Sequence, residues 1–383
     1  MDPVLGSCSP ETLRRRRSYK WVTHPADVLP AFVAEMDYDI AEPIKAALRE
    51  AIDLGDCGYA KPVGLGEAYA EFAEARHGWA PEPENVLAVP DVMTAVVEVI
   101  AAVTPPGAGI VVNPPVYPQF FHRLGFIGRE VVQAPLRRSA EGRYELDFEG
   151  LDQALGTPGV AAYLLCSPHN PVGRVWSRPD LLATAELCDR HGVVLLVDEI
   201  HAPLTLPGTE HTAFLSLDHE AATRAFTFTS ASKGWNIPGL KCGLAVVGSD
   251  DHRALLEGRW EALLASHLGV LATIAAFKEA TAWLDAMVGQ LQENRLHLST
   301  LLAGPLAEVV YYPPEASFLA WLDCRALALG DDPSAVFLDK GRVALSPGPD
   351  FGEQGQGFVR LNMGTSPELL EEIVRRMSAT LVS

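Results

Sequence analysis

Between residues 85 and 250, apolar and polar positions alternate in blocks. Five short runs are almost entirely apolar and are separated by amphipathic stretches: residues 109–113, 160–166, 193–197, 225–229 and 243–247. Apolar runs of this length are typical of strands buried on both faces. Residues 179–191 predict a helix, because Pro179 lies in its first turn and Gly192 follows its end. We therefore expect an α/β fold with a mostly parallel sheet covered by helices.

The pattern changes after residue 250. Residues 251–302 are rich in Ala and Leu and predict a long helical region. Short apolar runs then return, followed by a closing helix; they lie at 318–322, 343–345 and 358–361, with the helix over about 367–381. We expect a large domain over residues 45–285. A smaller α+β domain would combine residues 1–44 with residues 286–383, and 383 residues suffice for two such domains.

Charge and cysteine usage narrow the class of protein. The formal net charge of −19 argues against a nucleic-acid partner, since phosphate backbones bind basic surfaces. The basic run 14–17 fits a solvated arm. No signal peptide is recognisable, and no apolar run approaches the roughly 18 residues of a membrane span. The six cysteines, Cys8 among them, form no CxxC pair, which predicts free thiols and a cytoplasmic protein without membrane contact.

Three polar groups follow three of the apolar runs. Asn170 comes after the run 160–166, Asp198 ends the run that starts at residue 193, and Lys233 follows the run 225–229. Ligands bind outside the carboxyl ends of parallel strands, so we expect these groups to meet at one sheet edge. Each one alone also fits a turn, a helix cap or a surface lysine. Their coincidence favours a functional site.

An amine, a carboxylate and a set of phosphate-binding groups are what pyridoxal 5′-phosphate (PLP) requires. A buried lysine with a depressed pKa, here Lys233, forms a Schiff base with the cofactor aldehyde. A carboxylate such as Asp198 keeps the pyridine nitrogen protonated. The phosphate needs backbone N–H groups, hydroxyls and a cation, which Ser230, Ser232 and Lys241 can supply.

The segments around these residues resemble a known family. Residues 167–176, 198–201 and 230–241 are similar to class I/II aminotransferases, and more narrowly to the MalY/PatB-type cystathionine β-lyase branch. The resemblance runs from Ser18 to Asn362. It implies PLP fold type I, the aspartate-aminotransferase fold, with PLP as cofactor and an amino acid as substrate.

The resemblance also implies individual roles. Lys233 would be the Schiff-base lysine and the acid/base at the substrate Cα, while Asp198 pairs with the pyridine nitrogen. The remaining residues would surround the cofactor and substrate: Asn170 and His201 near the 3′ oxygen, Tyr117 on the ring, and Arg360 at the substrate α-carboxylate. Tyr59 would reach the phosphate in the neighbouring subunit, so a homodimer with shared sites is expected.

The chain departs from the family pattern at the phosphate site. The usual Gly-rich turn is replaced by residues 90–94, Pro-Asp-Val-Met-Thr. The backbone amides of Val92 and Met93 can still serve the phosphate, whereas Asp91 would repel it unless the side chain points away. Asp37-Tyr38 and residues 315–317 also differ from the family, which leaves the shape of the substrate pocket open.

The reaction is less closely defined than the cofactor. Removal of the Cα proton by Lys233 gives a quinonoid common to transamination and β-elimination. The resemblance implies a carbon–sulfur β-lyase that cleaves a cystathionine-like L-cysteine S-conjugate to a thiol, pyruvate and ammonia. An aminotransferase is the alternative, with a decarboxylase and a non-catalytic regulatory protein as minor ones. No metal site is expected, and Gly64-Leu-Gly66 does not follow a strand as a dinucleotide motif would.

Overall fold

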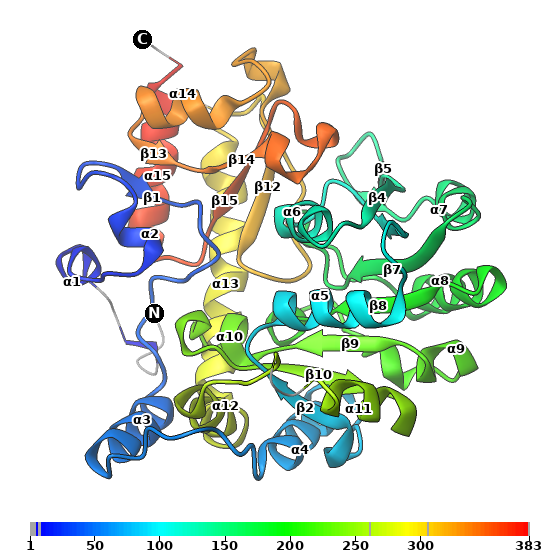
Figure 1. Cartoon of the computed structure of the whole chain (residues 1–383). Helices are drawn as coiled ribbons and strands as arrows, with labels where there is room; N and C mark the ends of the chain where they lie inside the picture. Colours follow the sequence, from blue (N-terminus) through cyan, green and yellow to red (C-terminus); the bar gives the residue numbers. More distant parts are fainter. Residues whose placement is uncertain (1–4, 7–8, 260–261, 305, 382–383) are drawn as a thin grey trace.

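The large part of the molecule is built on a seven-stranded sheet (Figure 1). The computed structural model describes residues 5–6, 9–259, 262–304 and 306–381. The strands follow the order β2 (Val86–Val89), β10 (Gly243–Val247), β9 (Phe226–Thr229), β8 (Val194–Asp198), β7 (Val160–Cys166), β3 (Gly109–Val112) and β4 (Glu130–Gln133). All neighbours are parallel except β10, which is antiparallel to both β2 and β9. The predicted mostly parallel sheet is thus confirmed.

Both faces of this sheet are buried, which explains why its strands read as uninterrupted apolar runs. Along β8, Leu196 joins the core on one face, whereas Leu195 and Val197 join the core on the other. The first face is covered by α5 (Val92–Val103), α6 (Pro118–Phe126) and α11 (Asp250–Glu257). The second is covered by α4 (Leu65–His77), α7 (Phe148–Leu155), α8 (Arg178–His191), α9 (Glu220–Thr223) and α12 (His267–Glu279).

Helix α8 shows how local sequence sets the ends of an element. Ser177 accepts a hydrogen bond from the Asp180 N–H, and the Asp180 side chain accepts one from the Ser177 N–H, which is a capping box. At the other end Gly192 has φ +65°, a conformation that glycine adopts without steric cost. The helix therefore occupies the predicted residues.

A smaller part of the molecule carries an antiparallel sheet of four strands. Their order is β11 (Val310–Tyr311), β12 (Leu319–Asp323), β15 (Phe358–Asn362) and β14 (Ser346–Pro347). Helices α13 (Thr281–Leu302), α14 (Pro333–Asp339) and α15 (Pro367–Ala379) pack with it around a separate core. The expected helical region 251–302 is interrupted: Ser266 caps α12, and α13 starts after Ala280, whose φ of −116° and ψ of 22° separate the two helices.

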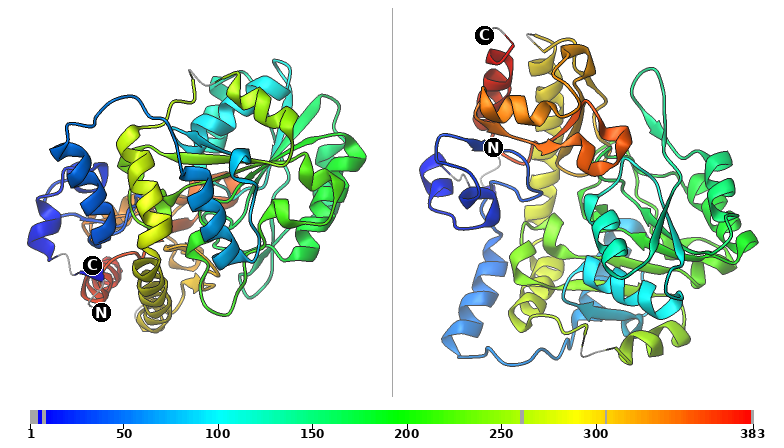
Figure 2. Two further views of the ribbon diagram at one scale, coloured as in Figure 1. Left: turned by 90° about the horizontal axis from the view of Figure 1, so that it is seen from below. Right: turned by 45° about the horizontal axis from the view of Figure 1, so that its top comes forward.

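The N-terminal segment lies against the C-terminal part of the chain (Figure 2). It contains α1 (Pro10–Arg14), α2 (Tyr19–Val22) and β1 (Leu29–Pro30), and β1 pairs in parallel with β13 (Val343–Ala344). The chain then crosses to α3 (Glu42–Asp53), which packs on α12. The expected domain limits after residues 44 and 285 fall inside α3 and α13, and this division stays a prediction.

Two further features bear on the class of protein. No helix in the described residues combines the length and apolarity that crossing a bilayer requires. The described cysteines are all unpaired; they are Cys57, Cys166, Cys188, Cys242 and Cys324, and Cys8 lies outside the described residues. The expectation of free thiols therefore holds for these five.

Candidate active site

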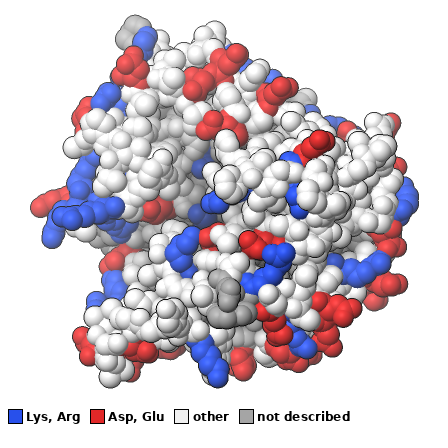
Figure 3. Space-filling model, viewed as in Figure 1, with Lys and Arg blue, Asp and Glu red and all other residues white. Residues whose placement is uncertain are grey.

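A cavity of about 510 Å³ opens at the carboxyl edge of the large sheet. Figure 3 shows this hollow near the middle of the molecule, where basic and acidic side chains lie next to each other. Eleven residues singled out from the sequence line it: Val92, Met93, Tyr117, Asn170, Asp198, His201, Ser230, Ser232, Lys233, Lys241 and Arg360. Tyr59 is not among the lining residues of its own chain.

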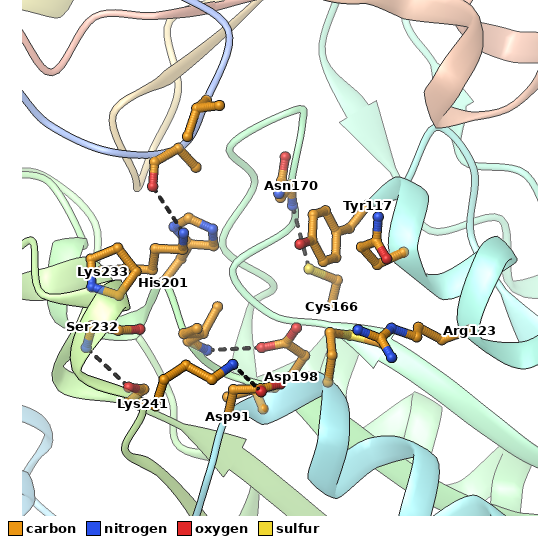
Figure 4. Close-up of a pocket in the computed structure, with 18 of the residues that line it drawn as sticks. Asp91, Tyr117, Arg123, Cys166, Asn170, Asp198, His201, Ser232, Lys233 and Lys241 are labelled. Carbon is orange, nitrogen blue, oxygen red and sulfur yellow. Dashed lines mark hydrogen bonds and ion pairs between the residues drawn. The ribbon is translucent and has the colours of Figure 1, made fainter. Parts of the chain in front are cut away.

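Neighbouring strands deliver the central groups. Cys166 and Asp198 end β7 and β8 and stand opposite each other in register. The loop after β7 brings Asn170 to the cavity, and α10 (Ala231–Gly234), which follows β9, brings Lys233 (Figure 4). The sheet topology therefore assembles the amide, the carboxylate and the amine at one edge, as the order of the apolar runs predicts.

Asp198 is a buried carboxylate, 4% exposed, that faces the cavity. Its Oδ1 accepts a hydrogen bond from the Ile200 N–H at 3.1 Å, and it makes no ion pair within the described part of the chain. Burial raises the pKa of Asp198 to about 7, which the Ile200 hydrogen bond and the charge of Lys233 oppose. A cationic N–H group in the cavity would complete its environment, because a buried carboxylate is stable only when paired.

Lys233 lies on the cavity wall, and its Nζ donates a hydrogen bond to the Ala34 carbonyl oxygen at 2.9 Å. Burial lowers the pKa of this amine to about 8, and the positive charge of Arg360 lowers it further, while Asp198 and Glu35 act in the opposite direction. Roughly a tenth of the amine is therefore neutral and nucleophilic at pH 7, far more than for an ordinary lysine.

His201 is held neutral beside Lys233. It is 2% exposed, and burial together with the charges of Lys233 and Arg360 lowers its pKa to about 3. Its Nδ1 is buried without a hydrogen-bond partner among the described residues. A neutral imidazole with an unused ring nitrogen can donate to or accept from a ligand group in the cavity.

Arg360 is a buried cation on β15, 6% exposed, at the boundary between the two parts of the molecule. Its guanidinium donates to Asn170 Oδ1 at 3.1 Å, to the Phe32 carbonyl oxygen at 2.9 Å and to Ser346 Oγ at 3.1 Å. Burial lowers its pKa to about 10. All three acceptors are neutral, its Nε has no partner, and it forms no ion pair with the described residues.

Phe32, Val33 and Ala34 line the cavity, and the carbonyl oxygens of the segment 32–36 that carries them are held mainly by side chains. Asn362 Nδ2 donates to the Val33 and Glu35 carbonyls, and Asn236 Nδ2 donates to that of Met36. The Lys233 and Arg360 bonds described above belong to the same set. Anchored at successive carbonyls, this segment presents a fixed surface to the cavity.

Tyr117 provides an aromatic wall at the start of α6. It is the N-cap residue of that helix, and its ring packs edge-on against Phe120 with centroids 5.9 Å apart. Burial raises the pKa of its hydroxyl, which stays protonated. An aromatic ring in this position suits a flat heteroaromatic ligand.

Anion-binding groups gather at one end of the cavity. Val92 and Met93 are the first two residues of α5, and the first N–H groups of a helix have no partner within it. The Ser232 hydroxyl lines the cavity and makes no hydrogen bond with the described residues. In contrast, Ser230 Oγ donates to the Cys242 carbonyl oxygen at 2.7 Å and accepts from the Ser232 N–H. Lys241 forms an ion pair with Asp91.

Several lining residues were not singled out from the sequence. Tyr19, Phe32 and Ala34 come from the N-terminal segment, Arg123 from α6 and Ser346 from β14. Long-range packing sets their positions, and no local sequence pattern marks them. In retrospect Arg123 could have been found, because it lies one helical turn after Gln119, which also lines the cavity. The Arg123 guanidinium points into the cavity (Figure 4) and makes no ion pair with the described residues.

These groups fit PLP on structural grounds. The unpaired buried carboxylate of Asp198 can hold a pyridinium N–H, and the amine of Lys233 in its neutral form can bond to the aldehyde carbon. Tyr117 can cover a ring face, and the N–H groups of Val92 and Met93 can receive a phosphate. Each part of the cofactor thus has a matching protein group in the cavity.

Comparison with known proteins agrees with this donor set. The family model described as aminotransferase class I and II matches residues 34–377. The chain is 39% identical to cystathionine beta-lyase PatB of Bacillus subtilis over 93% of both chains. It is 32% identical to protein MalY of Escherichia coli, covering 91% of this chain and 90% of MalY. The crystal structure of cystalysin from Treponema denticola, which contains PLP, superposes with a TM-score of 0.93 at 27% identity, over 99% of this chain and 98% of the other.

The predicted fold, family and cofactor are therefore confirmed. The chain belongs to the class I and II aminotransferase family of PLP-dependent enzymes, in the branch that contains the PatB- and MalY-type proteins.

Proposed function

We propose that this enzyme is a carbon–sulfur β-lyase that acts on an L-cysteine S-conjugate. The Cβ–S bond breaks, the sulfur leaves as a thiol after taking up a proton, and one water molecule converts the remaining three-carbon unit to pyruvate and ammonia. The relatives named cystathionine beta-lyase support the type of bond broken. The α-amino acid part of the substrate is supported by the chain's own residues.

The observation that carries the amino-acid part of the proposal is the buried, unpaired guanidinium of Arg360. A buried cation whose hydrogen bonds all go to neutral acceptors lacks the charge that would offset its desolvation. A carboxylate bound there gains a charge-assisted, two-point interaction. Arg360 is also close enough to lower the pKa of Lys233, so a carboxylate bound to Arg360 lies near the amine.

When bound, PLP withdraws electrons from the substrate Cα and so lowers the barrier to removal of the Cα proton. In our proposal Asp198 holds the positive charge at the pyridine nitrogen. Lys233 takes the Cα proton, which its lowered pKa permits near neutral pH. Arg360 fixes the carboxylate and thereby the rotation of the Cα substituents relative to Lys233.

We further propose that the enzyme works as a homodimer with shared sites. Tyr59 is 95% exposed in the stretch between α3 and α4, and Leu54 and Val63 are exposed nearby. Three large apolar or aromatic side chains exposed together on one connecting segment are typical of an interface. Tyr59 of the partner subunit would reach the cavity and its hydroxyl would donate to the phosphate.

The test is product analysis without any keto acid. The purified PLP-loaded enzyme is incubated with L-cystathionine or an S-alkyl-L-cysteine, and pyruvate and free thiol are measured together. Equal, repeated release of both supports β-elimination. Lys233→Ala is expected to abolish it, whereas Lys340→Ala, which removes an exposed lysine of α14's C-terminus, is expected to retain it.

An aminotransferase would give the opposite result. It would release no thiol, and an amino acid would be converted only when a keto acid is added. That outcome would refute the lyase proposal while leaving the cofactor site intact.

A further inference from the structure

The cavity contains a carboxylate at the end where the cofactor phosphate would bind. A negative charge is unexpected at a place that has to bind an anion. Asp91 precedes α5 and lines the cavity together with Val92 and Met93. Its Oδ2 lies 2.5 Å from Lys241 Nζ, and Figure 4 shows the two side chains joined. The Asp91 side chain does not point away from the site, as would be needed to avoid the phosphate.

Asp91 already binds two groups that an incoming phosphate would need, namely the N-terminus of α5 and the ammonium of Lys241. Its Oδ1 accepts the Thr94 N–H at 2.9 Å, which makes it the N-cap of α5. An N-cap carboxylate neutralises part of the positive charge at a helix N-terminus. Its Oδ2 engages the ammonium of Lys241 and accepts from Thr94 Oγ1 at 3.0 Å.

The remaining phosphate-binding groups are few. The Ser230 hydroxyl proton is bonded to the Cys242 carbonyl oxygen, so the N–H groups of Val92 and Met93 and the Ser232 hydroxyl are left. A dianionic phosphate at this end would stand beside a carboxylate that is charged at neutral pH. Like charges a few ångströms apart in a partly buried site disfavour binding.

We infer that Asp91 is an internal competitor for the cofactor phosphate: it holds Lys241 in the cofactor-free enzyme and must share or release it when PLP binds. The enzyme therefore binds its phosphorylated cofactor less tightly than its other groups would allow, and Asp91 sets how readily PLP is lost. The inference rests on the PLP site described above and does not depend on which substrate bond is broken.

Asn is the sharpest replacement, because it keeps the side-chain shape and caps helices as well as Asp does. Cofactor-free Asp91→Asn enzyme is titrated with PLP and, separately, with pyridoxal, which lacks the phosphate; binding is followed by visible absorbance and tryptophan fluorescence. We expect PLP to bind at least about tenfold more tightly than to wild type, because the repulsion between the phosphate and one nearby like charge is removed. Pyridoxal binding is expected to stay unchanged.

A matched control removes a capping carboxylate elsewhere. Asp332 is the N-cap of α14 and accepts from the Ser334 N–H at 3.0 Å, outside the cavity. Asp332→Asn is expected to leave both affinities unchanged. Unchanged or weaker PLP binding by Asp91→Asn would overturn the inference, because Asp91 would then be neutral toward the phosphate or would position Lys241 for it. An equal gain for pyridoxal would also overturn it.

A second measurement examines the coupling to Lys241. Lys241→Gln is expected to weaken PLP binding more in the Asp91→Asn background than in wild type, since Asp91 no longer neutralises the lysine there. An equal loss in both backgrounds would show that the two residues act independently and would refute the competition.

Discussion

Arg360 Nη1 donates a hydrogen bond to Asn170 Oδ1 at 3.1 Å, which ties a strand of the small sheet to the loop after β7 of the large one. The two residues are 190 positions apart in the chain. The proposed carboxylate-binding residue is thus fixed to a proposed cofactor-binding residue, so that substrate and cofactor would be held by one connected group of side chains.

Replacing Arg360 tests its proposed part in substrate binding. Arg360→Gln removes the charge. Arg360→Lys keeps the charge but loses the planar guanidinium, which can bind a carboxylate with two parallel hydrogen bonds. We expect kcat/KM to fall about 100-fold or more for Gln, mostly through KM, as expected for loss of a charge-assisted pair worth roughly 2–3 kcal/mol. Lys should recover only part of the loss. The free energy of unfolding in urea serves as the control for intact folding, and a twofold change in kcat/KM for Gln would contradict the role.

Capture of PLP by the cofactor-free enzyme should depend on the protonation of Lys233. Burial, aided by Arg360, lowers the pKa of this amine to about 8. The amine is protonated and unreactive below that pH and neutral above it, so the capture rate should rise with pH and level off above about 8. Stopped-flow absorbance measures the rate. Arg360→Gln should move the midpoint upward because it removes a repelling charge, and a midpoint near 10.5 in wild type would contradict the assignment.

The buried ion pair of Lys20 and Asp37 should matter for stability. Lys20 Nζ lies 2.8 Å from Asp37 Oδ2, and both side chains are almost fully buried. Lys20→Met leaves Asp37 buried without its partner, so we expect the free energy of unfolding in urea to fall by about 3–5 kcal/mol. Lys45→Met breaks the more exposed pair with Asp39 and should cost less than about 1 kcal/mol. Equal losses of unfolding free energy would show that burial does not make the first pair more important for stability.

Shared sites predict complementation between an inactive chain and a chain with weakened PLP binding, measured at a PLP concentration that does not saturate the second. Lys233→Ala lacks the amine, and Tyr59→Ala is expected to lose PLP affinity severalfold. In a mixed dimer, one site combines Lys233 of the Tyr59→Ala chain with Tyr59 of the partner subunit. Refolding the two variants together should therefore restore activity, up to one active site per mixed dimer. Mixtures no more active than Tyr59→Ala alone would refute the sharing of sites.

The mostly parallel sheet and the central groups at its strand ends could be predicted from the sequence for one physical reason. Parallel strands buried on both faces read as apolar runs, and their carboxyl ends lie at one edge. The placement of Asn170, Asp198 and Lys233 at one cavity follows from that rule alone. The end of α11 at Glu257, the start of α12 at His267 and the break at Ala280 were not evident, because Ala- and Leu-rich segments favour a helix on either side of a break.

By itself, then, the sequence determined the α/β fold and the place of the candidate PLP-binding groups at the strand ends, since these depend on periodicity and on chain order. Only the tertiary structure decided which partners those groups have. Ala34 receives the Lys233 hydrogen bond, Asp91 pairs with Lys241 150 positions away, and the Ser230 hydroxyl turns to Cys242. Such contacts join irregular segments that the tertiary fold brings together, and no local sequence pattern records them because each partner lies in a different segment of the chain.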